Sequence, residues 1–284
     1  MPPSRDPSGL LQPLNIPVLL RQYNLRPSKG LGQNFLIDPA ALQRVTAAAE
    51  IAASDTVLEI GAGLGSLTRH LAAAARHVIA IELDDRLFPA LQAVLAASSN
   101  VTIIHGDILQ LDIAALVNMP GYLVVANIPY YITSALIRHL LEAKIKPSRL
   151  ILTVQREVAE RICAAPDKMS LLALSVQVYG KPAIVSQIPA GAFHPAPKVD
   201  SSVVRVDLYP QPLIDPAQLK DFFRLAKAGF SQRRKTLRNA LAAGMRLKPP
   251  QAADLLQQAG IEPNRRAETL HLAEWAALTA ACAE

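Results

Sequence analysis

The sequence predicts a doubly wound α/β sheet followed by a small all-helical domain. Apolar β runs alternate with helical stretches through most of the chain, whereas everything after Pro212 has helical patterning. The chain has 284 residues, enough for two domains, and Pro210 and Pro212 mark the boundary between them. We expect an N-terminal extension over residues 1–27, a sheet domain over 28–210 and a helical domain over 211–284.

Strands and helices are predicted from apolar periodicity and capping signals. Asp38 is typical of an N-cap, and Pro39 suits the first turn of the helix that follows. The last two predicted strands are joined without a helix, which predicts one antiparallel strand at the end of a mostly parallel sheet. Predicted strands occupy residues 56–60, 77–81, 101–104, 122–127, 149–154, 183–188 and 201–208, and predicted helices occupy residues 16–25, 38–53, 66–75, 85–97, 133–143 and parts of 156–179.

Charge is distributed unevenly along the chain. The formal net charge is +6 and the pI is about 9.4, which indicates an anionic partner. Residues 38–120 contain nine acidic and four basic residues, a net charge of −5. Residues 220–248 contain nine basic residues and one acidic residue, a net charge of +8. The predicted helical domain therefore supplies the attraction for a polyanion.

The cysteine content and the apolar segments also indicate the cellular compartment of the protein. Cys163 and Cys282 are far apart and lack the spacing of metal ligands, so we expect a reducing environment, no disulfide framework and no metal. No apolar run approaches the ~18 residues of a membrane span. Pro13 and Pro17 interrupt the N-terminal apolar segment, which makes it a poor signal peptide. We expect a cytoplasmic monomer without membrane association.

A glycine-rich loop follows the first strand of the predicted sheet. Gly61, Gly63 and Gly65 lie where a cofactor meets a helix N-terminus in sheets of this kind. Dinucleotide-binding proteins have the spacing G-x-G-x-x-G, whereas Ser66 occupies the last of those positions here. The loop alone is therefore weak support for a dinucleotide.

Acidic residues end the next two predicted strands. Glu82 suits the two hydroxyls of a ribose, and Asp107 is placed to accept a hydrogen bond from an adenine amino group. Together with Glu59 or Gly61 they form a series of strand ends that favours S-adenosyl-L-methionine. The negative charge of this region also suits a sulfonium cation better than phosphates. We therefore predict a Rossmann-like, S-adenosyl-L-methionine-dependent methyltransferase domain.

Asn127 ends the fourth predicted strand, where open α/β sheets bind ligands, and Pro129 stiffens the turn that follows. A carboxamide cannot act as a base near neutral pH, but it can accept a hydrogen bond from an amine. Beside S-adenosyl-L-methionine this predicts methyl transfer to the nitrogen of a flipped-out base. Tyr130 would stack on one side of the base and Phe193 on the other, although Phe193 taken alone fits a core position better.

Seven stretches extend this pattern from about Leu25 to the C-terminus. They are Leu31–Leu36, Glu59–Gly63, Ile81–Asp84, Gly106–Asp107, Asn127–Tyr130, Phe193–Ser201 and Gln232–Thr236. In this order they resemble the rRNA adenine N6-dimethyltransferases, most closely the small-subunit (16S rRNA) KsgA type.

The resemblance implies an enzyme that dimethylates two adjacent adenosines in a hairpin near the 3′ end of 16S rRNA, with the small-subunit precursor as its partner. It implies that Asn127 and the Ile128 carbonyl hold the target amine, while Tyr130 and Phe193 pack the adenine. The implied S-adenosyl-L-methionine site consists of Asn34, Leu36, Gly61, Glu82, Asp107 and Asn127, and Gly63 belongs to the same glycine loop.

Three alternatives remain open at this point. A large-subunit rRNA methyltransferase of the antibiotic-resistance type shares the Gln-Asn-Phe and Asn-Ile-Pro-Tyr signatures, although Phe193–Ser201 and Gln232–Thr236 favour the small-subunit type. A non-catalytic RNA-binding assembly factor on the same fold is disfavoured by the complete set of predicted cofactor residues. Ser66 disfavours a dehydrogenase.

A basic run in the helical domain provides the candidate RNA contact. Arg233, Arg234 and Lys235, with Arg238, are predicted to lie on a helix, where Arg234 and Arg238 share a face. Short charge runs are usually solvated faces, but this one lies in the region of net charge +8. We predict that it binds rRNA phosphates and orients the RNA, whereas the aromatic residues of the site select the base.

Overall fold

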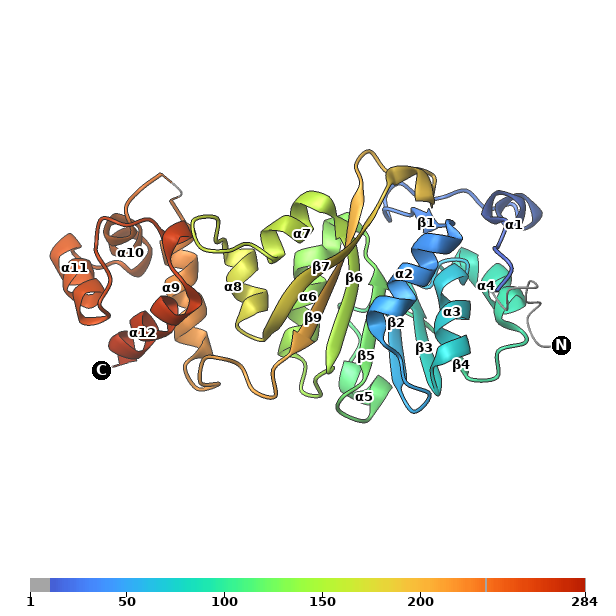
Figure 1. Ribbon diagram of the computed structural model, residues 1–284, viewed down its shortest axis with the longest axis horizontal. Coiled ribbons are helices and arrows are strands. Elements are labelled where there is room, and N and C mark those ends of the chain that lie inside the picture. Colours follow the sequence, from blue (N-terminus) through green and yellow to red (C-terminus); the bar gives the residue numbers. More distant parts are fainter. Residues whose placement is uncertain (1–10, 233, 284) are drawn as a thin grey trace. The chain divides into compact units, whose positions relative to one another are not determined.

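The computed structural model describes residues 11–232 and 234–283, apart from the side chains of Tyr130 and Ala283 (Figure 1). The chain forms two compact units. The first contains the described residues up to Ala159 together with Ala183–Leu208, and the second contains Glu160–Pro182 and the described residues from Tyr209 onward. The second unit thus includes Glu160–Pro182, which the domain boundaries predicted from the sequence had placed in the sheet domain.

Seven strands of the described chain form one sheet in the order β4-β3-β2-β5-β6-β9-β7 (Figure 1). The strands β2 to β6 run parallel to one another, and β9 runs antiparallel to β6. Their bounds are β2 (Thr56–Ile60), β3 (His77–Glu82), β4 (Val101–His105), β5 (Leu123–Asn127), β6 (Arg149–Gln155), β7 (Gly180–Ile188) and β9 (Ser201–Leu208).

The predicted antiparallel strand is present, but it does not lie at the edge of the sheet. The helices α7 (Arg156–Ile162) and α8 (Leu171–Gln177) connect β6 to β7, which forms the edge of the sheet two strand positions from β6. The return segment then places β9 in the gap between β6 and β7. The sequence shows that no long helix joins the last two strands, which predicts an antiparallel strand. It does not show which strands the returning strand would lie between.

Helices connect the parallel strands at close to the predicted positions. Asp38 caps the first of them, since its carboxylate accepts a hydrogen bond from the Ala41 amide at 2.6 Å. That helix ends at Ala49, earlier than predicted, because Glu50 adopts a left-handed conformation with φ +48°. The helices are α2 (Pro39–Ala49), α3 (Ser66–Ala74), α4 (Phe88–Leu95), α5 (Ile113–Val117) and α6 (Thr133–Glu142).

The core of the first unit lies between these helices and the sheet. Leu42 and Val45 of α2 and Leu71 of α3 pack with Val57 of β2 and Val125 of β5, and all five are at most 3% exposed. Both faces of the central strands are apolar, as expected for parallel strands covered on two sides. This burial fixes the register of β2, β3 and β5, and with it the position of their carboxyl ends.

The order of the strands places a switch point at the centre of the sheet. From β2 the chain moves outward to β3 and β4, and it then crosses back to pair β5 with the other side of β2. The loops after β2 and β5 therefore leave in opposite directions. Such a reversal opens a crevice at the carboxyl ends of the strands, which is the usual ligand site of the fold.

Part of the predicted N-terminal extension belongs to the first unit. The helix α1 (Ile16–Gln22) is capped by Asn15, whose side chain accepts a hydrogen bond from Val18 N–H at 3.1 Å. Its buried Ile16 and Leu20 form a small core with Phe35, Leu64, Leu87 and Ala90. The segment after residue 15 thus packs beside the glycine loop.

The described residues of the second unit are mainly helical, as predicted for the chain after Pro212. A Cβ added at Gly244 would lie 2.5 Å from the Cβ of Ala228 and 2.7 Å from its Cα, so α9 and α10 cross at very short range. Trp275 is fully buried and stacks on Phe230 with ring centroids 5.6 Å apart. The helices are α8, α9 (Leu219–Phe230), α10 (Leu237–Met245), α11 (Pro249–Gln258) and α12 (Leu272–Ala283). No helix in the described part of the chain has the length and apolar character needed to cross a membrane.

Replacement of Gly244 by alanine should destabilise the helical unit by about 1–3 kcal/mol, because the added methyl overlaps backbone atoms of α9. The destabilisation should appear although alanine favours a helix over glycine. Urea unfolding followed by the fluorescence of Trp275, the single tryptophan, measures it. Gly191→Ala is the control, because a Cβ there meets nothing within 4 Å. Equal midpoints for both variants would contradict the close crossing.

Candidate active site

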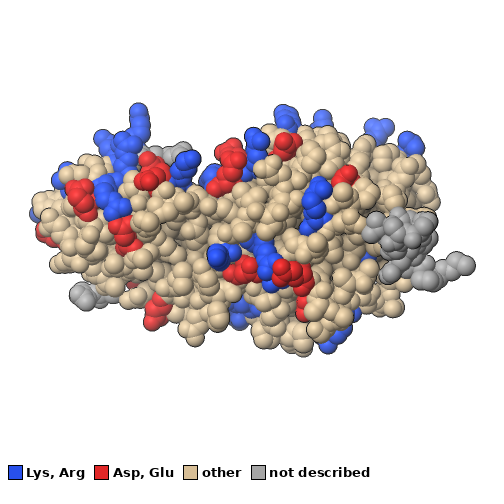
Figure 2. All heavy atoms as spheres, viewed as in Figure 1, with Lys and Arg blue, Asp and Glu red and all other residues tan. Residues whose placement is uncertain are grey.

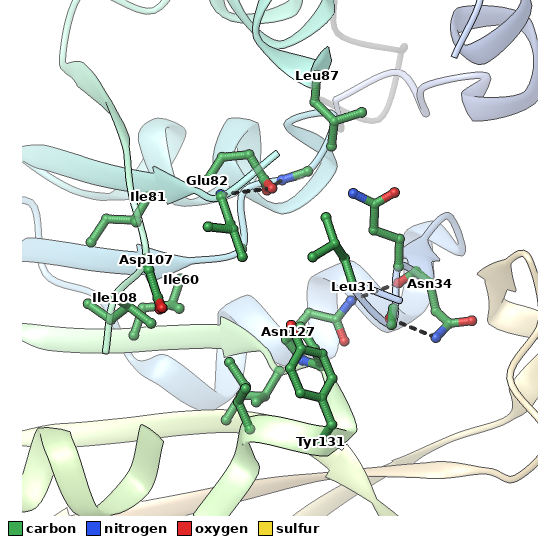
Figure 3. Close-up of a pocket in the computed structure, with 18 of the residues that line it drawn as sticks. Leu31, Asn34, Ile60, Ile81, Glu82, Leu87, Asp107, Ile108, Asn127 and Tyr131 are labelled. Carbon is green, nitrogen blue, oxygen red and sulfur yellow. Dashed lines mark hydrogen bonds between the residues drawn. The ribbon is translucent and has the colours of Figure 1, made fainter. Parts of the chain in front are cut away.

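A cavity of about 270 Å³ lies at the carboxyl ends of β2, β3, β4 and β5 (Figure 3). Its wall combines the ends of these strands with residues 31–35 of the N-terminal loop and with the turn after β5. Six residues predicted to bind the cofactor line it together: Asn34, Gly61, Gly63, Glu82, Asp107 and Asn127. The fold therefore brings the predicted strand ends into a single site at the switch point.

The glycine loop forms one wall of the cavity through its backbone. Gly63 has φ +60°, and a Cβ there would lie 3.0 Å from the ring of Phe35. Its N–H donates to Glu82 Oε2 at 2.7 Å. Gly61 has φ +79° and lies beside the carbonyl oxygen of Asn127, at 3.6 Å from an added Cβ. Side chains at these two positions would strain the backbone and push the loop away from Phe35 and from β5.

Glu82 is held by three backbone amides at the end of β3. Its Oε1 accepts from Leu83 N–H at 2.9 Å and from Asp84 N–H at 2.8 Å, while Oε2 accepts from Gly63 N–H. Burial raises the pKa of this carboxyl, and the amide hydrogen bonds oppose that rise by favouring the charged form. Two carboxylate oxygens offer about four acceptor positions, so Glu82 can still accept a hydrogen bond from a cavity ligand.

Asp107 and its neighbours form the wall after β4. One carboxylate oxygen of Asp107 accepts from Leu109 N–H at 3.0 Å, which fixes the side chain at the cavity. Buried Ile108 adds apolar surface beside Asp107, and buried Leu87 lines the cavity from the chain after β3 (Figure 3). A flat apolar group with an amino substituent fits between such side chains, because the carboxylate can accept from the amino group.

Asn127 has a fixed orientation at the end of β5. Its Nδ2 donates to the carbonyl oxygen of Asn34 at 2.9 Å, a bond that joins residues far apart in the sequence. With the amide nitrogen used in this way, the Oδ1 acceptor is the atom available to an amine in the cavity. The sequence predicted this acceptor role, and the structure adds the partner that orients the amide.

The cavity also contains residues that the sequence did not assign to it. Gln33, Phe35 and Leu87 line it, as does Tyr131, whose side chain is 60% exposed. Gln33 could have been predicted as a cavity residue, because it lies next to Asn34 in the Gln-Asn-Phe signature. Leu87 gives no such signal, because it reaches the cavity only through the packing of the chain after β3.

Two predicted site residues do not line the cavity. Leu36 is 4% exposed and Phe193 is 3% exposed, and both belong to the main core of the first unit. The reason is the short antiparallel pair of β1 (Phe35–Leu36) and β8 (Phe193–His194), in which Leu36 and Phe193 are opposite each other. Side chains alternate along a strand, so Phe35 faces the cavity while its neighbour faces the core.

The remaining predicted residues lie outside the cavity or outside the described residues. The side chain of Tyr130 and all of Arg233 fall in the latter group. Arg234 and Lys235 are exposed in the connection between α9 and α10, not on a helix, and only Arg238 is helical. The helix prediction was wrong here because α9 packs against α10, so the chain must reverse direction between them.

The chain matches the ribosomal RNA adenine dimethylase family over residues 24–284. It belongs to this family. A family relative from Dehalococcoides mccartyi (strain CBDB1), named ribosomal RNA small subunit methyltransferase A, is 47% identical over 90% of this chain and 89% of its own. A relative of the same name from Moorella thermoacetica is 42% identical over 92% of this chain and 94% of its own.

Solved structures of rRNA methyltransferases have the same fold. The dimethyladenosine transferase from Plasmodium falciparum has a TM-score of 0.74 and is 26% identical, covering 86% of this chain and 95% of its own. The 23S rRNA methyltransferase ErmE has a TM-score of 0.72 and is 27% identical, covering 88% of this chain and 100% of its own. The predicted Rossmann-like methyltransferase fold is thereby confirmed.

Family membership also confirms the predicted enzyme class. The protein is an rRNA adenine dimethyltransferase that uses S-adenosyl-L-methionine as its methyl donor. The small-subunit prediction is favoured over the large-subunit alternative, because relatives named for the small subunit share 42–47% identity whereas ErmE shares 27%. The residues present fit this cofactor: glycines leave room beside the strand ends, backbone amides orient a carboxylate able to accept from ribose hydroxyls, and apolar side chains line the cavity together with Asp107.

Glu59 precedes the glycine loop but turns away from the cavity into the core. It is 1% exposed, and its Oε2 has no hydrogen-bond partner among the described residues. Burial raises the pKa of this carboxyl to about 8; the nearby Thr68 hydroxyl opposes the rise, and the charge of Glu82 adds to it. Glu59 is therefore protonated at neutral pH and lies buried in the first unit, whereas the glycine loop that follows it forms the cavity wall.

Replacement of Glu59 by glutamine should remove a pH-dependent loss of stability. The unfolded carboxyl titrates near pH ~4.3, so between about pH 4 and 8 the folded chain holds a proton that the unfolded chain has released. The free energy of unfolding of the native protein should therefore fall as pH rises through that window and level off above it.

Chemical denaturation of both proteins at pH 5.5 and 8.5 tests this. The advantage of Glu59→Gln over the native protein should grow by about 1 kcal/mol or more at the higher pH, since each pKa unit is worth ~1.4 kcal/mol. Glu142→Gln is the matched control, because Glu142 is exposed and pairs with Arg138. Equal differences at the two pH values would show that Glu59 is ionised in the fold.

Proposed function

We propose that this protein transfers methyl groups to the N6 amino groups of two adjacent adenosines in a hairpin near the 3′ end of 16S rRNA. It would act in the cytoplasm, as a monomer, during assembly of the small ribosomal subunit. The observation that best supports the chemistry is the orientation of Asn127, whose Nδ2 is bound to Asn34 O while its Oδ1 remains for an amine.

Each residue of the cavity has a proposed task. S-adenosyl-L-methionine supplies, when bound, a methyl group on a positively charged sulfur. Glu82 binds the ribose hydroxyls, and Asp107 accepts from the adenine amino group of the cofactor. Asn127 Oδ1 and the Ile128 carbonyl accept hydrogen bonds from the target amine and favour its pyramidal form, which exposes the nitrogen lone pair. Attack by a neutral amine requires no general base.

The target base needs an aromatic surface outside the stack of the RNA. Tyr130 follows Asn127 in the same turn and is proposed to supply one face. Phe193 can supply a second face only if β8 moves, because its side chain lies in the core. Tyr131 is the described aromatic side chain that already lies at the open side of the cavity (Figure 3).

The second unit is proposed to bind the phosphate backbone of the RNA. Figure 2 shows Lys and Arg side chains gathered near the α9–α10 connection and α10. Arg234 and Lys235 project from this connection into solvent, which leaves them free to follow a phosphate backbone. Arg238, on the first turns of α10, extends the same basic region.

Replacement of Asn127 by alanine should lower turnover by about 10²–10³-fold, the usual effect of removing one hydrogen bond made in the transition state. Cofactor affinity should fall by a much smaller factor than turnover. The lost Oδ1 atom is the one proposed to bind the target amine, whereas the lost Nδ2 atom only helps to hold Asn34 beside the cavity. Labelled-methyl transfer to the 3′ hairpin of small-subunit rRNA measures turnover, and calorimetry measures affinity. Gln257→Ala, an exposed change on α11, is the control. Turnover within a few-fold of the native value would remove Asn127 from catalysis, and preferred methylation of large-subunit rRNA would refute the substrate.

Replacement of Arg234 and Lys235 by alanine should weaken RNA binding and flatten its salt dependence, with the log–log slope falling by roughly 0.7–0.9 for each phosphate that is no longer bound. Cofactor binding should not change. Affinity for the hairpin is measured across a salt series. The variant Arg44→Ala/Lys168→Ala removes the same charge at other exposed positions and is the control. Coinciding slopes for the two double variants would show that the α9–α10 connection does not bind the RNA.

A further inference from the structure

The segment Ser28–Asn34, here called the cavity loop, is closed by one side chain. The amide oxygen of Gln33 accepts from Ser28 N–H at 2.7 Å, and Gln33 N–H donates to Ser28 O at 3.2 Å. The other end of the same amide leaves the loop, because Gln33 Nε2 donates to Asp84 Oδ2 at 2.8 Å. Gln33 thus joins the cavity loop to the chain that follows β3.

Asp84 is built to receive this bond. Its side chain is 3% exposed, and Arg86 pairs with both carboxylate oxygens, with Nε–Oδ1 at 2.7 Å and Nη2–Oδ2 at 2.6 Å. Arg86 lowers the pKa of Asp84, so the acceptor for Gln33 is charged. The backbone N–H of Asp84 donates to Glu82, the carboxylate at the cofactor cavity.

The next residue of the cavity loop is bound on the opposite side of the cavity. The carbonyl oxygen of Asn34 accepts from Asn127 Nδ2, and Asn34 Nδ2 donates to Gly32 O at 3.0 Å. Consecutive residues therefore connect the cavity loop to the ends of β3 and β5. The loop spans the cavity between the residue placed at the ribose and the residue placed at the target amine.

We propose that Gln33 is a positioning residue that, through Asp84, holds the cavity loop over the cofactor and fixes the Asn34 carbonyl that orients Asn127. The cofactor part of this inference follows from the cavity alone, and the part that concerns Asn127 rests on the proposed function. If the Gln33–Asp84 bond is broken, the loop can lift from the cavity. Cofactor affinity should then fall about ten-fold, and turnover at saturating cofactor should fall by a smaller factor because Asn127 loses its fixed partner.

Three variants separate this role from a merely structural one. Gln33→Glu keeps the acceptor for Ser28 N–H but replaces the donor to Asp84 by a carboxylate oxygen, so it should weaken cofactor binding about ten-fold. Asp84→Asn should weaken cofactor binding less, since an amide oxygen can still accept from Gln33.

The double variant Gln33→Glu/Asp84→Asn reverses the direction of the hydrogen bond, with the new amide donating to the new carboxylate. It should recover most of the cofactor affinity. Arg86→Ala is a comparison, because it removes the residue that holds Asp84 in place but leaves the Gln33 amide intact, so it should weaken cofactor binding less than Gln33→Glu does.

The measurements are cofactor affinity by calorimetry, KM for the cofactor and kcat with hairpin RNA, and thermal unfolding of each variant. Recovery of affinity in the double variant, without a matching recovery of unfolding temperature, is expected. Native affinity in Gln33→Glu, or a double variant no better than Gln33→Glu, would overturn the proposal. Failure of the native protein to methylate small-subunit rRNA would refute the proposed function instead, and the affinities would still decide the role of Gln33.

Discussion

The pairing of β5 with β2 at the centre of the sheet determines where the chemistry can occur. Because the chain leaves these neighbouring strands in opposite directions, their carboxyl ends border an open space that helices do not fill. Gly61 and Asn127 lie on its two sides, and the absence of a side chain at Gly61 keeps the ends close. Three further features line this space: a carboxylate from β3, another from the chain after β4, and residues 31–34 of the cavity loop.

Two glutamates on adjacent strands, Glu59 and Glu82, differ in their surroundings and therefore in what stabilises their charged or neutral form. Glu82 ends β3, where burial still raises its pKa but three backbone amides oppose that rise by stabilising the charged form. Glu59 lies within β2 and faces the core, where burial dominates and keeps it neutral near pH 7. The difference follows from strand geometry, because residues within a strand alternate between the faces of the sheet while a terminal residue meets the loop amides.

The elements that could be predicted from the sequence are those fixed by local pattern. Parallel strands buried on both faces leave long apolar runs, so their ends, including Glu82 and Asn127, were placed correctly. The places of Leu36 and Phe193 could not be predicted, because the two-residue ladder that turns both into the core pairs segments far apart in the chain. The same limit applies to Arg234 and Lys235, whose helical pattern is overridden by the packing of α9 on α10.

The cavity and the choice of RNA are separate properties of this fold. ErmE, named a 23S rRNA methyltransferase, is similar over its full length, whereas the more similar relatives are named for the small subunit. The same fold thus occurs in enzymes whose names refer to different RNAs, so the fold of the sheet does not by itself select between those RNAs. Selection must come from surfaces that differ while the cavity is kept. The region with a net charge of +8 lies in the helical unit, away from the strand ends in sequence. If this region binds the RNA as proposed, substitutions there can change RNA affinity without disturbing the hydrogen bonds that hold Glu82 and Asn127.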